Sequence, residues 1–417
     1  MVNNDSTPTT EPIVLRQPEQ LLRQVLGRDL IVVDCQQVPL LPPGENYASL
    51  MLKVDVVVKK KPDADNERLE LVAKMAPGTS LQQRIVKITA AWKKEIYIFK
   101  ELIPQYRELQ REVGVAEKDL IDILPKYYGS RLSLDLNERD KADLDAVLLM
   151  ENLKSIGYDT YDRNKGMDFA HAKMAISKLA EYHALGLAFR MKKPDLFEEA
   201  RTMTDTIPFD FTSGTTAGFD DHILKIICND SRMAPYRDRI KKNLDKSKNF
   251  GYYNLKAVEP WVTITHGDVW GNNMMFKEDD DKNPIDIKFV DFQIAFACSP
   301  MKDIPYFLCT SLRIDTFIDH LDDLLDVYHN QLIDSLTRLR CDTSPFLREQ
   351  FDEQLQHDAS DQFSRCMLTL KFITMNTAEN DIDLNDLKGS VVESKANDVF
   401  VERLWQAIRV FVEKDWM

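Results

Sequence analysis

Residues 263–300, TITHGDVWGNNMMFKEDDDKNPIDIKFVDFQIAFACSP, contain the most informative pattern in this chain of 417 residues. Two short apolar segments, 274–276 and 287–290, lie on either side of a polar stretch, 277–286, that contains Pro284. Apolar runs of this length around a polar, proline-containing stretch are typical of two strands joined by a turn. The pattern therefore predicts an antiparallel hairpin.

Three polar side chains are expected to meet at the open end of this hairpin. Asn273 precedes the first strand and Asp291 follows the second, and paired strands lie only about 4.8 Å apart. Asp268, five residues before Asn273, can loop back to the same end. Acidic residues are common in turns, but HGD-x4-N followed 18 residues later by a strand ending in Asp rarely arises by chance. Two carboxylates and a carboxamide suit Mg²⁺, with phosphate and water completing its coordination.

The earlier part of the chain predicts a small sheet. Segments 52–58 and 69–75 alternate apolar and polar residues, which is the period of a half-buried strand. The polar segment 59–68 between them predicts a turn, so the two strands form a second hairpin. The apolar run 146–153 predicts a further strand.

A helix is expected between these strands. Ser80 and Gln83 fit a capping box, and apolar residues follow at steps of three and four as far as Ile103. We expect Pro104 to end this helix. Helical periodicity returns over 168–200 and most of 315–417.

The composition excludes several classes of protein. Hydrophobic residues make up 44% and charged residues 29% of the chain, which rules out dominant disorder and a fibrous repeat. The formal net charge of −14 argues against nucleic acid as a partner, because phosphate binding requires a basic surface. No apolar run approaches the roughly 18 residues that span a bilayer, so membrane insertion is not expected.

Two further features predict a cytoplasmic protein. The N-terminal residues are polar and show no basic segment before an apolar stretch, so no secretory signal is expected. The six cysteines are scattered without a CxxC motif, as free thiols of a reducing compartment are. The pattern leaves the oligomeric state open.

Three stretches together resemble a known family. HGDVWGNN, at 266–273, is similar to the HGD-x4-N catalytic loop of aminoglycoside phosphotransferases and choline kinases, and VDFQ takes the place of the metal-binding Asp-Phe-Gly of protein kinases. With LAEYHALGLAFR at 179–190 and VDFQIAFACSPMKDIPYFL at 290–308, the chain more narrowly resembles the ecdysteroid-kinase-like (EcKinase, CHK-kinase-like) family of arthropods. This resemblance extends from about residue 35 to residue 415.

The resemblance implies a fold and an activity. The fold would be α+β and bilobal, like that of protein kinases, with a tail at 1–20, a small β-rich N-lobe at 21–150 and a large, mostly helical C-lobe at 151–417. The activity would be ATP-dependent transfer of the γ-phosphoryl group to a hydroxyl of a small-molecule alcohol, such as an ecdysteroid or a similar apolar alcohol. ATP and Mg²⁺ would be the cofactors.

The resemblance also assigns roles to the residues of the hairpin. Asp268 would be the catalytic base, and Asn273 and Asp291 would hold Mg²⁺ against the phosphates. Gln293 stands where protein kinases have glycine, which casts doubt on regulation by an activation loop. His266 is expected to brace the catalytic loop and Asp303 to cap it from behind.

Lys74 and Glu95 are predicted to form an ion pair. Lys74 shares one face of its strand with Val72, and Glu95 lies on the apolar stripe of the predicted helix. Burial of a carboxylate costs several kcal/mol unless a cation pairs with it. In kinases a lysine–glutamate pair of this kind positions the nucleotide phosphates. The remaining residues expected around the nucleotide are Gly44 and Ser49 in a phosphate-covering loop, Val72, and Met150, Glu151 and Leu153 at the hinge.

Other assignments remain open at this point. The acceptor cannot be read from the sequence, and choline-like or aminoglycoside-like alcohols remain alternatives. A non-catalytic pseudokinase that binds a nucleotide or small molecule is the main rival. A metal-dependent phosphohydrolase is disfavoured, because two-metal sites use more His and Asp ligands than this chain, with seven scattered histidines, offers. His183 is expected to be a hydrogen-bonded core histidine.

Overall fold

The computed structural model describes residues 14–40, 49–76, 87–206, 217–247, 257–375, 394 and 396–417. The chain forms two compact units. Unit 1 comprises Met1–Arg84 and Lys126–Asn152, and unit 2 comprises Ile85–Pro125 and Leu153–Met417. Within the expected N-lobe at 21–150, the segment Ile85–Pro125 belongs to unit 2 by its contacts, and the bounds of the two lobes stay a prediction.

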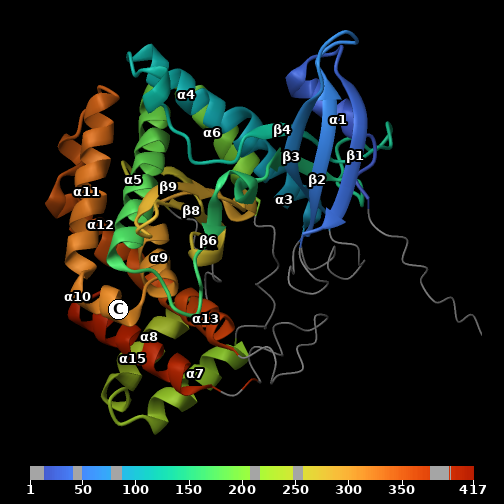
Figure 1. Ribbon diagram of the computed structural model, residues 1–417. Coiled ribbons are helices and arrows are strands. Elements are labelled where there is room, and N and C mark those ends of the chain that lie inside the picture. Colours follow the sequence, from blue (N-terminus) through green and yellow to red (C-terminus); the bar gives the residue numbers. More distant parts are fainter. Residues whose placement is uncertain are drawn as a thin grey trace, which may run out of the picture. The chain divides into compact units, whose positions relative to one another are not determined.

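In its described residues, unit 1 is an antiparallel sheet with one helix (Figure 1). Its elements are α1 (Pro18–Leu26), β1 (Ile31–Pro39), β2 (Leu50–Lys59), β3 (Glu67–Met75), β4 (Tyr127–Arg131) and β5 (Val147–Glu151). The strand order is β1-β2-β3-β5-β4, and every neighbouring pair is antiparallel. The three strands predicted at 52–58, 69–75 and 146–153 are therefore confirmed.

The two faces of this sheet differ in character. Leu52, Val54 and Val56 of β2 are buried in the core of unit 1, together with Leu21 and Leu22 of α1. Alternate residues of a strand point to opposite faces, so Val72 and Lys74 of β3 lie on the face away from this core. Val72 pairs with Met150 and Lys74 with Leu148. The period-2 pattern thus places Lys74 on the face that α1 does not cover.

The first described helix of unit 2 continues beyond the end that the sequence predicts. Its parts are α3 (Ile88–Tyr97), a π-helical turn (Ile98–Leu102) and α4 (Ile103–Glu112). The expectation that Pro104 ends the helix is wrong. In the widened turn the N–H of Ile103 bonds to the carbonyl of Ile98, and Pro104 then falls in the first turn of α4, where a missing N–H costs little. Ser80 and Gln83 lie outside the described residues.

The rest of unit 2 is mostly helical, as predicted. The helices are α5 (Phe169–Lys192), α6 (Pro194–Thr204), α7 (Ala217–Asn229), α8 (Arg237–Ser247), α9 (Asp303–Ser311), α10 (Ile314–Asp319), α11 (Leu321–Arg338), α12 (Arg348–Ala359), α13 (Phe363–Thr374) and α15 (Asp398–Glu413). In Figure 1, α5 and α11 run side by side, and the contacts between them agree. The predicted α+β class, with a small β-rich part and a larger helical part, is confirmed.

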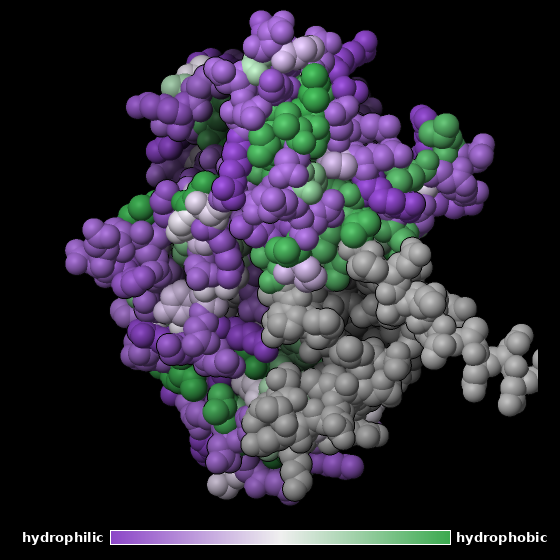
Figure 2. Space-filling model, turned by 45° about the vertical axis from the view of Figure 1, so that its right-hand side comes forward, coloured by the Kyte–Doolittle hydropathy of each residue, from purple (hydrophilic) through white to green (hydrophobic). Residues whose placement is uncertain are grey.

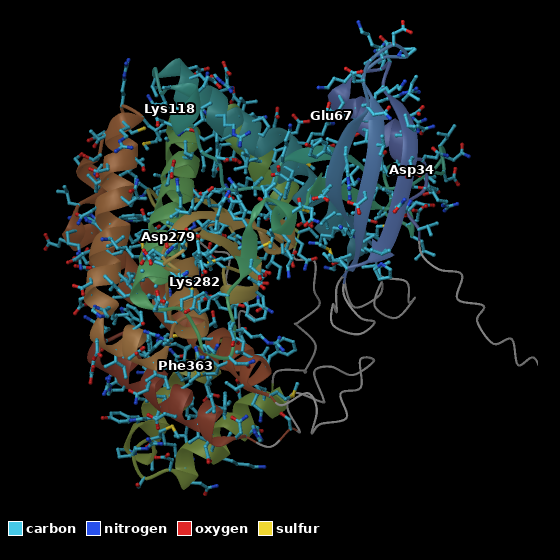
Figure 3. All side chains as sticks on the ribbon, viewed as in Figure 1. Asp34, Glu67, Lys118, Asp279, Lys282 and Phe363 are labelled. Atoms are coloured by element: carbon cyan, nitrogen blue, oxygen red, sulfur yellow. The ribbon has the colours of Figure 1, made fainter. Side chains whose placement is uncertain are left out.

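Two small sheets contain the strands of residues 263–300. One has the order β6-β8-β9, formed by Tyr158–Thr160, Met274–Glu278 and Pro284–Phe289. In the other, β7 (Thr263–Thr265) pairs with β10 (Phe296–Cys298). The β8–β9 hairpin is confirmed, with Met274 opposite Phe289. Asp279 and Lys282 mark its exposed turn (Figure 3), where Asp279 Oδ1 accepts the N–H groups of Asp281 and Asn283.

The surface of the described residues is largely polar. On the face drawn in Figure 2, hydrophilic side chains predominate and hydrophobic ones form limited patches. Among the described helices, none combines the length and the apolar character that crossing a membrane requires.

Candidate active site

The loop that follows β7 is held by a buried carboxylate. Asp303, the first residue of α9, accepts the N–H of His266 at 2.8 Å and the N–H of Gly267 at 3.1 Å. His183 Nε2 lies 3.2 Å from the same carboxylate, and His183 Nδ1 lies 2.7 Å from the hydroxyl of Tyr328. The expected roles of Asp303 as a cap and His183 as a hydrogen-bonded core histidine are both confirmed.

The electrostatics of Asp303 agree with this role. Burial raises the pKa of its carboxyl group, but the hydrogen bond from His183 and the electrostatic interaction with that imidazole oppose burial, and the pKa lies below its usual range. Asp303 is therefore an anion that accepts two amide hydrogens. A buried anion with several donors is stable where an unpaired one is not.

His266 braces the loop from within. Its Nδ1 accepts the N–H of Asp268 at 3.2 Å, so the ring hydrogen resides on Nε2, which donates to the carbonyl of Val290 at 3.2 Å. Burial lowers the pKa of His266, which favours this neutral form. The imidazole thus links the loop 266–273 to the end of the hairpin, and the expected bracing role is confirmed.

Asp268 and Asn273 are in direct contact. Asn273 Nδ2 donates to Asp268 Oδ2 at 2.9 Å and to the backbone carbonyl of Asp268 at 2.8 Å. The hydroxyl of Tyr306 donates to Asp268 Oδ1 at 2.7 Å. The Asp268 side chain is 18% exposed, and burial raises the pKa of its carboxyl group, although Arg365 and the Tyr306 hydroxyl oppose that effect.

Asp291 lies next to this pair. The N–H of Val290 donates to the carbonyl of Asn273 at 3.0 Å, which fixes the residue before Asp291 at the end of the hairpin. Asp291 has a left-handed backbone conformation, with φ at 68°, and its Oδ2 accepts from Gln293 Nε2 at 3.3 Å. Its charge contributes to raising the pKa of Asp268. The structure therefore brings Asp268, Asn273 and Asp291 to one end of the hairpin, as predicted.

The donor set at this end suits a hard cation. Both hydrogens of the Asn273 amide are directed at Asp268, so its Oδ1 is turned away from that residue. Within the described residues, no group of three or more His, Cys, Asp or Glu side chains is placed to hold a metal ion. A carboxylate and an amide oxygen with phosphate and water as further ligands are a coordination set that Mg²⁺ accepts.

Two residues around Asp268 were missed by the sequence analysis. Tyr306 on α9 donates to the carboxylate, and Arg365 on α13 lies 3.5 Å from Asp268 Oδ1 and bonds to the carbonyl of Gly267. Arg365 could have been predicted from the apolar residues around it in 363–373, because a cation buried among them requires a partner. Tyr306 carries no such local signal.

The residues expected around the nucleotide are distributed over both units. In unit 1, Ser49, Val72, Lys74 and Met150 are buried, and the N–H of Glu151 donates to the carbonyl of Lys126 at 2.9 Å. In unit 2, Leu153 is buried in a 3-10 turn. Gly44 lies outside the described residues, so the phosphate-covering loop stays a prediction.

Glu95 belongs to the part of unit 2 that packs beside the hairpin. It is buried on α3, and α3 packs against the 3-10 turn Phe292–Ile294 that directly follows Asp291. The neighbouring Lys94 donates to the carbonyl of Thr206 at 2.9 Å and lies 4.4 Å from the centre of the Phe296 ring. The predicted pairing of Glu95 with Lys74 stays a prediction.

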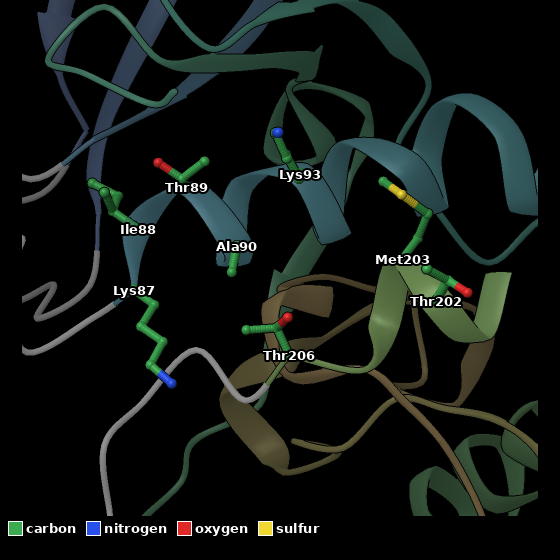
Figure 4. Close-up of a pocket in the computed structure, with 8 residues that line it drawn as sticks. All are labelled: Lys87, Ile88, Thr89, Ala90, Lys93, Thr202, Met203 and Thr206. Carbon is green, nitrogen blue, oxygen red and sulfur yellow. The ribbon is translucent and has the colours of Figure 1, made fainter. Parts of the chain in front are cut away.

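A cavity of about 490 Å³ opens beside the start of α3 (Figure 4). Its walls come from α3 and from the end of α6, and they carry two lysines and three threonines. The lining residues are Lys87, Ile88, Thr89, Ala90, Lys93, Thr202, Met203 and Thr206. The cavity shares no residue with the loop of Asp268 or with the end of the hairpin.

The chain belongs to a family of kinase-like proteins. Residues 43–341 match the ecdysteroid kinase-like family, which is more than half of the chain. The resemblance seen in the catalytic loop is therefore confirmed at the level of the family. No curated protein matches the chain.

Solved structures of small-molecule kinases are similar to the chain only distantly. A Plasmodium vivax ethanolamine kinase is 12% identical, with 96% of this chain and 89% of that chain covered and a TM-score of 0.39. A Cryptosporidium parvum choline kinase is 9% identical, with 93% and 92% covered and a TM-score of 0.41. An amicoumacin kinase in complex with AMP-PNP, Ca²⁺ and amicoumacin is 10% identical, with 86% and 87% covered and a TM-score of 0.40.

Proposed function

We propose that this protein is an ATP- and Mg²⁺-dependent kinase that phosphorylates a hydroxyl group of a small apolar alcohol, such as an ecdysteroid. The observation that carries the proposal is the contact between Asp268 and Asn273 at the end of the hairpin, with Asp291 beside them. Membership of the ecdysteroid kinase-like family supports the same reading. Lys74 is proposed to bind the nucleotide phosphates.

The role of Asp268 follows from its surroundings. Phosphoryl transfer has a loose transition state, so orientation of the acceptor hydroxyl matters more than the strength of the base. One oxygen of Asp268 accepts a hydrogen bond from Asn273 and the other accepts one from Tyr306. Each oxygen retains a lone pair for a further hydrogen bond. We propose that the acceptor hydroxyl donates to Asp268 and is aligned by it.

Asp291 and Asn273 would hold the divalent cation. When bound, the cation would neutralise charge on the phosphates. Gln293 orients the Asp291 carboxylate by its hydrogen bond, and Asp268 fixes the Asn273 amide so that its oxygen faces away from the catalytic carboxylate. This division of tasks keeps Asp268 available for the acceptor.

An apolar acceptor agrees with the side chains beside Asp268. Trp270 is half-buried, two residues after Asp268, and its ring lies 6.4 Å from that of Phe372 on α13. Such an aromatic pair offers apolar contact area to a ring system. An amino alcohol could also use Trp270 through a cation–π contact, so the acceptor requires a direct test.

The test is ADP formation across a panel of alcohols. The purified chain is incubated with Mg-ATP and with ecdysteroids, amino alcohols or glycosides, and Asp268→Asn and Asp279→Asn are run in parallel. We expect the wild type to turn over an apolar alcohol. Asp268→Asn should lower kcat by about 10²–10⁴-fold. Asp279→Asn should leave kcat unchanged, because Asp279 lies in the exposed turn of the hairpin.

Two results would contradict the proposal. Nucleotide binding in a thermal-shift assay without ADP release for any alcohol would identify a pseudokinase. If amino alcohols are phosphorylated faster than steroids, the proposed kinase activity stands and the proposed apolar acceptor is wrong.

A further inference from the structure

One face of α13 lies along the catalytic loop and its supporting side chains. Arg365, Thr369 and Phe372 are spaced by four and three residues, which places them on the same side of a helix. Arg365 bonds to the carbonyl of Gly267, Thr369 lies 3.2 Å from the Tyr306 hydroxyl, and Phe372 contacts Trp270. The family match ends at residue 341, so α13 lies beyond the part of the chain that it covers.

Arg365 is buried against the loop. It is 7% exposed, and its guanidinium lies 3.9 Å from the centre of the Tyr306 ring and 3.5 Å from Asp268 Oδ1. Burial of a cation is costly unless anions and acceptors surround it. The contacts of Arg365 with Gly267 and Asp268 provide that compensation, and its planar group can bond to the loop and stack on the ring at once.

Tyr306 directs its hydrogen at the catalytic carboxylate. A phenol carries one hydrogen, and that hydrogen is donated to Asp268 Oδ1. Thr369 Oγ1 must therefore be the donor in its 3.2 Å contact with the Tyr306 hydroxyl. Burial raises the pKa of Tyr306 well above its usual value, so the phenol stays a donor. The result is a directed chain from Thr369 through Tyr306 to Asp268.

We propose that Arg365 and Tyr306 are positioning residues, which fix the orientation of the Asp268 carboxylate toward the acceptor hydroxyl and so make α13 part of the catalytic apparatus. This inference rests on the proposed kinase function. Asp268 is held at Oδ1 by Tyr306 and at Oδ2 by Asn273, so rotation of the carboxylate breaks a hydrogen bond. A misplacement of about 1 Å at a reacting group can cost about 100-fold in rate.

The kinetic test is a double-mutant cycle. Tyr306→Phe removes the hydroxyl and keeps the ring under Arg365, whereas Arg365→Met removes the cation. With the alcohol that gives turnover, we expect each change to lower kcat by about tenfold or more and to leave the KM for ATP unchanged. In an Asp268→Asn background, each substitution should change kcat by less than about twofold, because Tyr306 and Arg365 act through the Asp268 carboxylate.

The same cycle can overturn the inference. If Tyr306→Phe and Arg365→Met lower kcat in the Asp268→Asn background by the same factors as in the wild type, the two residues act independently of Asp268. A rise in the KM for ATP with kcat unchanged would likewise contradict a positioning role. Arg348→Met is the matched control, because Arg348 pairs with Asp352 on the surface, and it should leave both constants unchanged.

A second measurement does not depend on turnover. Hydrogen–deuterium exchange of the amides of 266–270 reports how firmly the loop is held. We expect faster exchange there in Arg365→Met and Tyr306→Phe than in the wild type and in Arg348→Met. Unchanged exchange in both variants would overturn the inference. If no alcohol is phosphorylated but exchange rises as expected, the proposed function fails while the contact of α13 with the loop stands.

Discussion

Asp303 accepts the backbone N–H of His266 at 2.8 Å, and so anchors the start of the loop 266–273 to the first turn of α9. The next amide, that of Gly267, donates to the same carboxylate at 3.1 Å. Gly267 then has a φ of 77°, which L-residues rarely adopt, so the chain turns sharply directly before Asp268. The backbone of the loop is thereby fixed before Asp268.

Gly267→Ala should disrupt this loop. A Cβ at Gly267 would overlap the carbonyl of Ile294, and the left-handed conformation itself costs about 1–2 kcal/mol for alanine. We expect a lower free energy of unfolding and a loss of activity, measured by urea denaturation and ADP formation. Gly114→Ala is the matched control, since Gly114 has a φ of 91° and open space at its Cβ position. Equal losses in the two variants would show that the close approach to Ile294 has no effect.

Asp291→Asn should abolish Mg²⁺-dependent turnover and leave the fold intact. Asparagine tolerates the left-handed conformation of residue 291, so the change removes the charge without adding backbone strain. ADP formation should fall to background at every Mg²⁺ concentration, while the thermal unfolding midpoint stays close to that of the wild type. EDTA should abolish ADP formation by the wild type, and added Mg²⁺ should restore it. Undiminished turnover of the variant would remove Asp291 from the metal site.

Lys74→Met should weaken nucleotide binding. Lys74 is a buried cation on the face of the sheet that lies away from the core of unit 1, and a cation there suits an anionic ligand. We expect a rise of about tenfold or more in the Kd for Mg-ATP, measured by calorimetry. Lys53→Met is the control, because Lys53 is a second lysine on the same face of the sheet, opposite Val72, and its ion pair with Asp55 at 3.2 Å holds it on its own strand. Equal Kd values for wild type and Lys74→Met would exclude Lys74 from the nucleotide site.

Lys94 should make stability depend on pH. Burial lowers the pKa of its amine to about 7, whereas the unfolded chain retains the usual value of about 10.4. Between these two values the unfolded chain binds a proton that the folded chain does not, so the stability contributed by Lys94 rises with pH across this window. The free energy of unfolding of wild type relative to Lys94→Met should therefore be greater at about pH 9.5 than at about pH 6. The same difference at both pH values would show that the amine titrates at its ordinary value.

Local patterns in the sequence predicted much of the site. The β8–β9 hairpin follows from two apolar runs around a polar turn, and pairing alone brings Asn273 and Asp291 to one end. The expected effect of Pro104 was wrong for an equally local reason. The π-helical turn before it shifts the hydrogen-bonding register of the helix, and no residue preference predicts such a turn.

By itself, the sequence determined the strands, most of the helices and the meeting of Asp268, Asn273 and Asp291 at one end of the hairpin, because periodicity and turn residues act between near neighbours in the chain. The tertiary structure alone decided which side chains hold Asp268. Tyr306 lies 38 positions from Asp268 and Arg365 lies 98 positions from Gly267, so no local period relates them. Packing of α9 and α13 brings them together, and burial of the Arg365 cation then makes the loop its necessary partner.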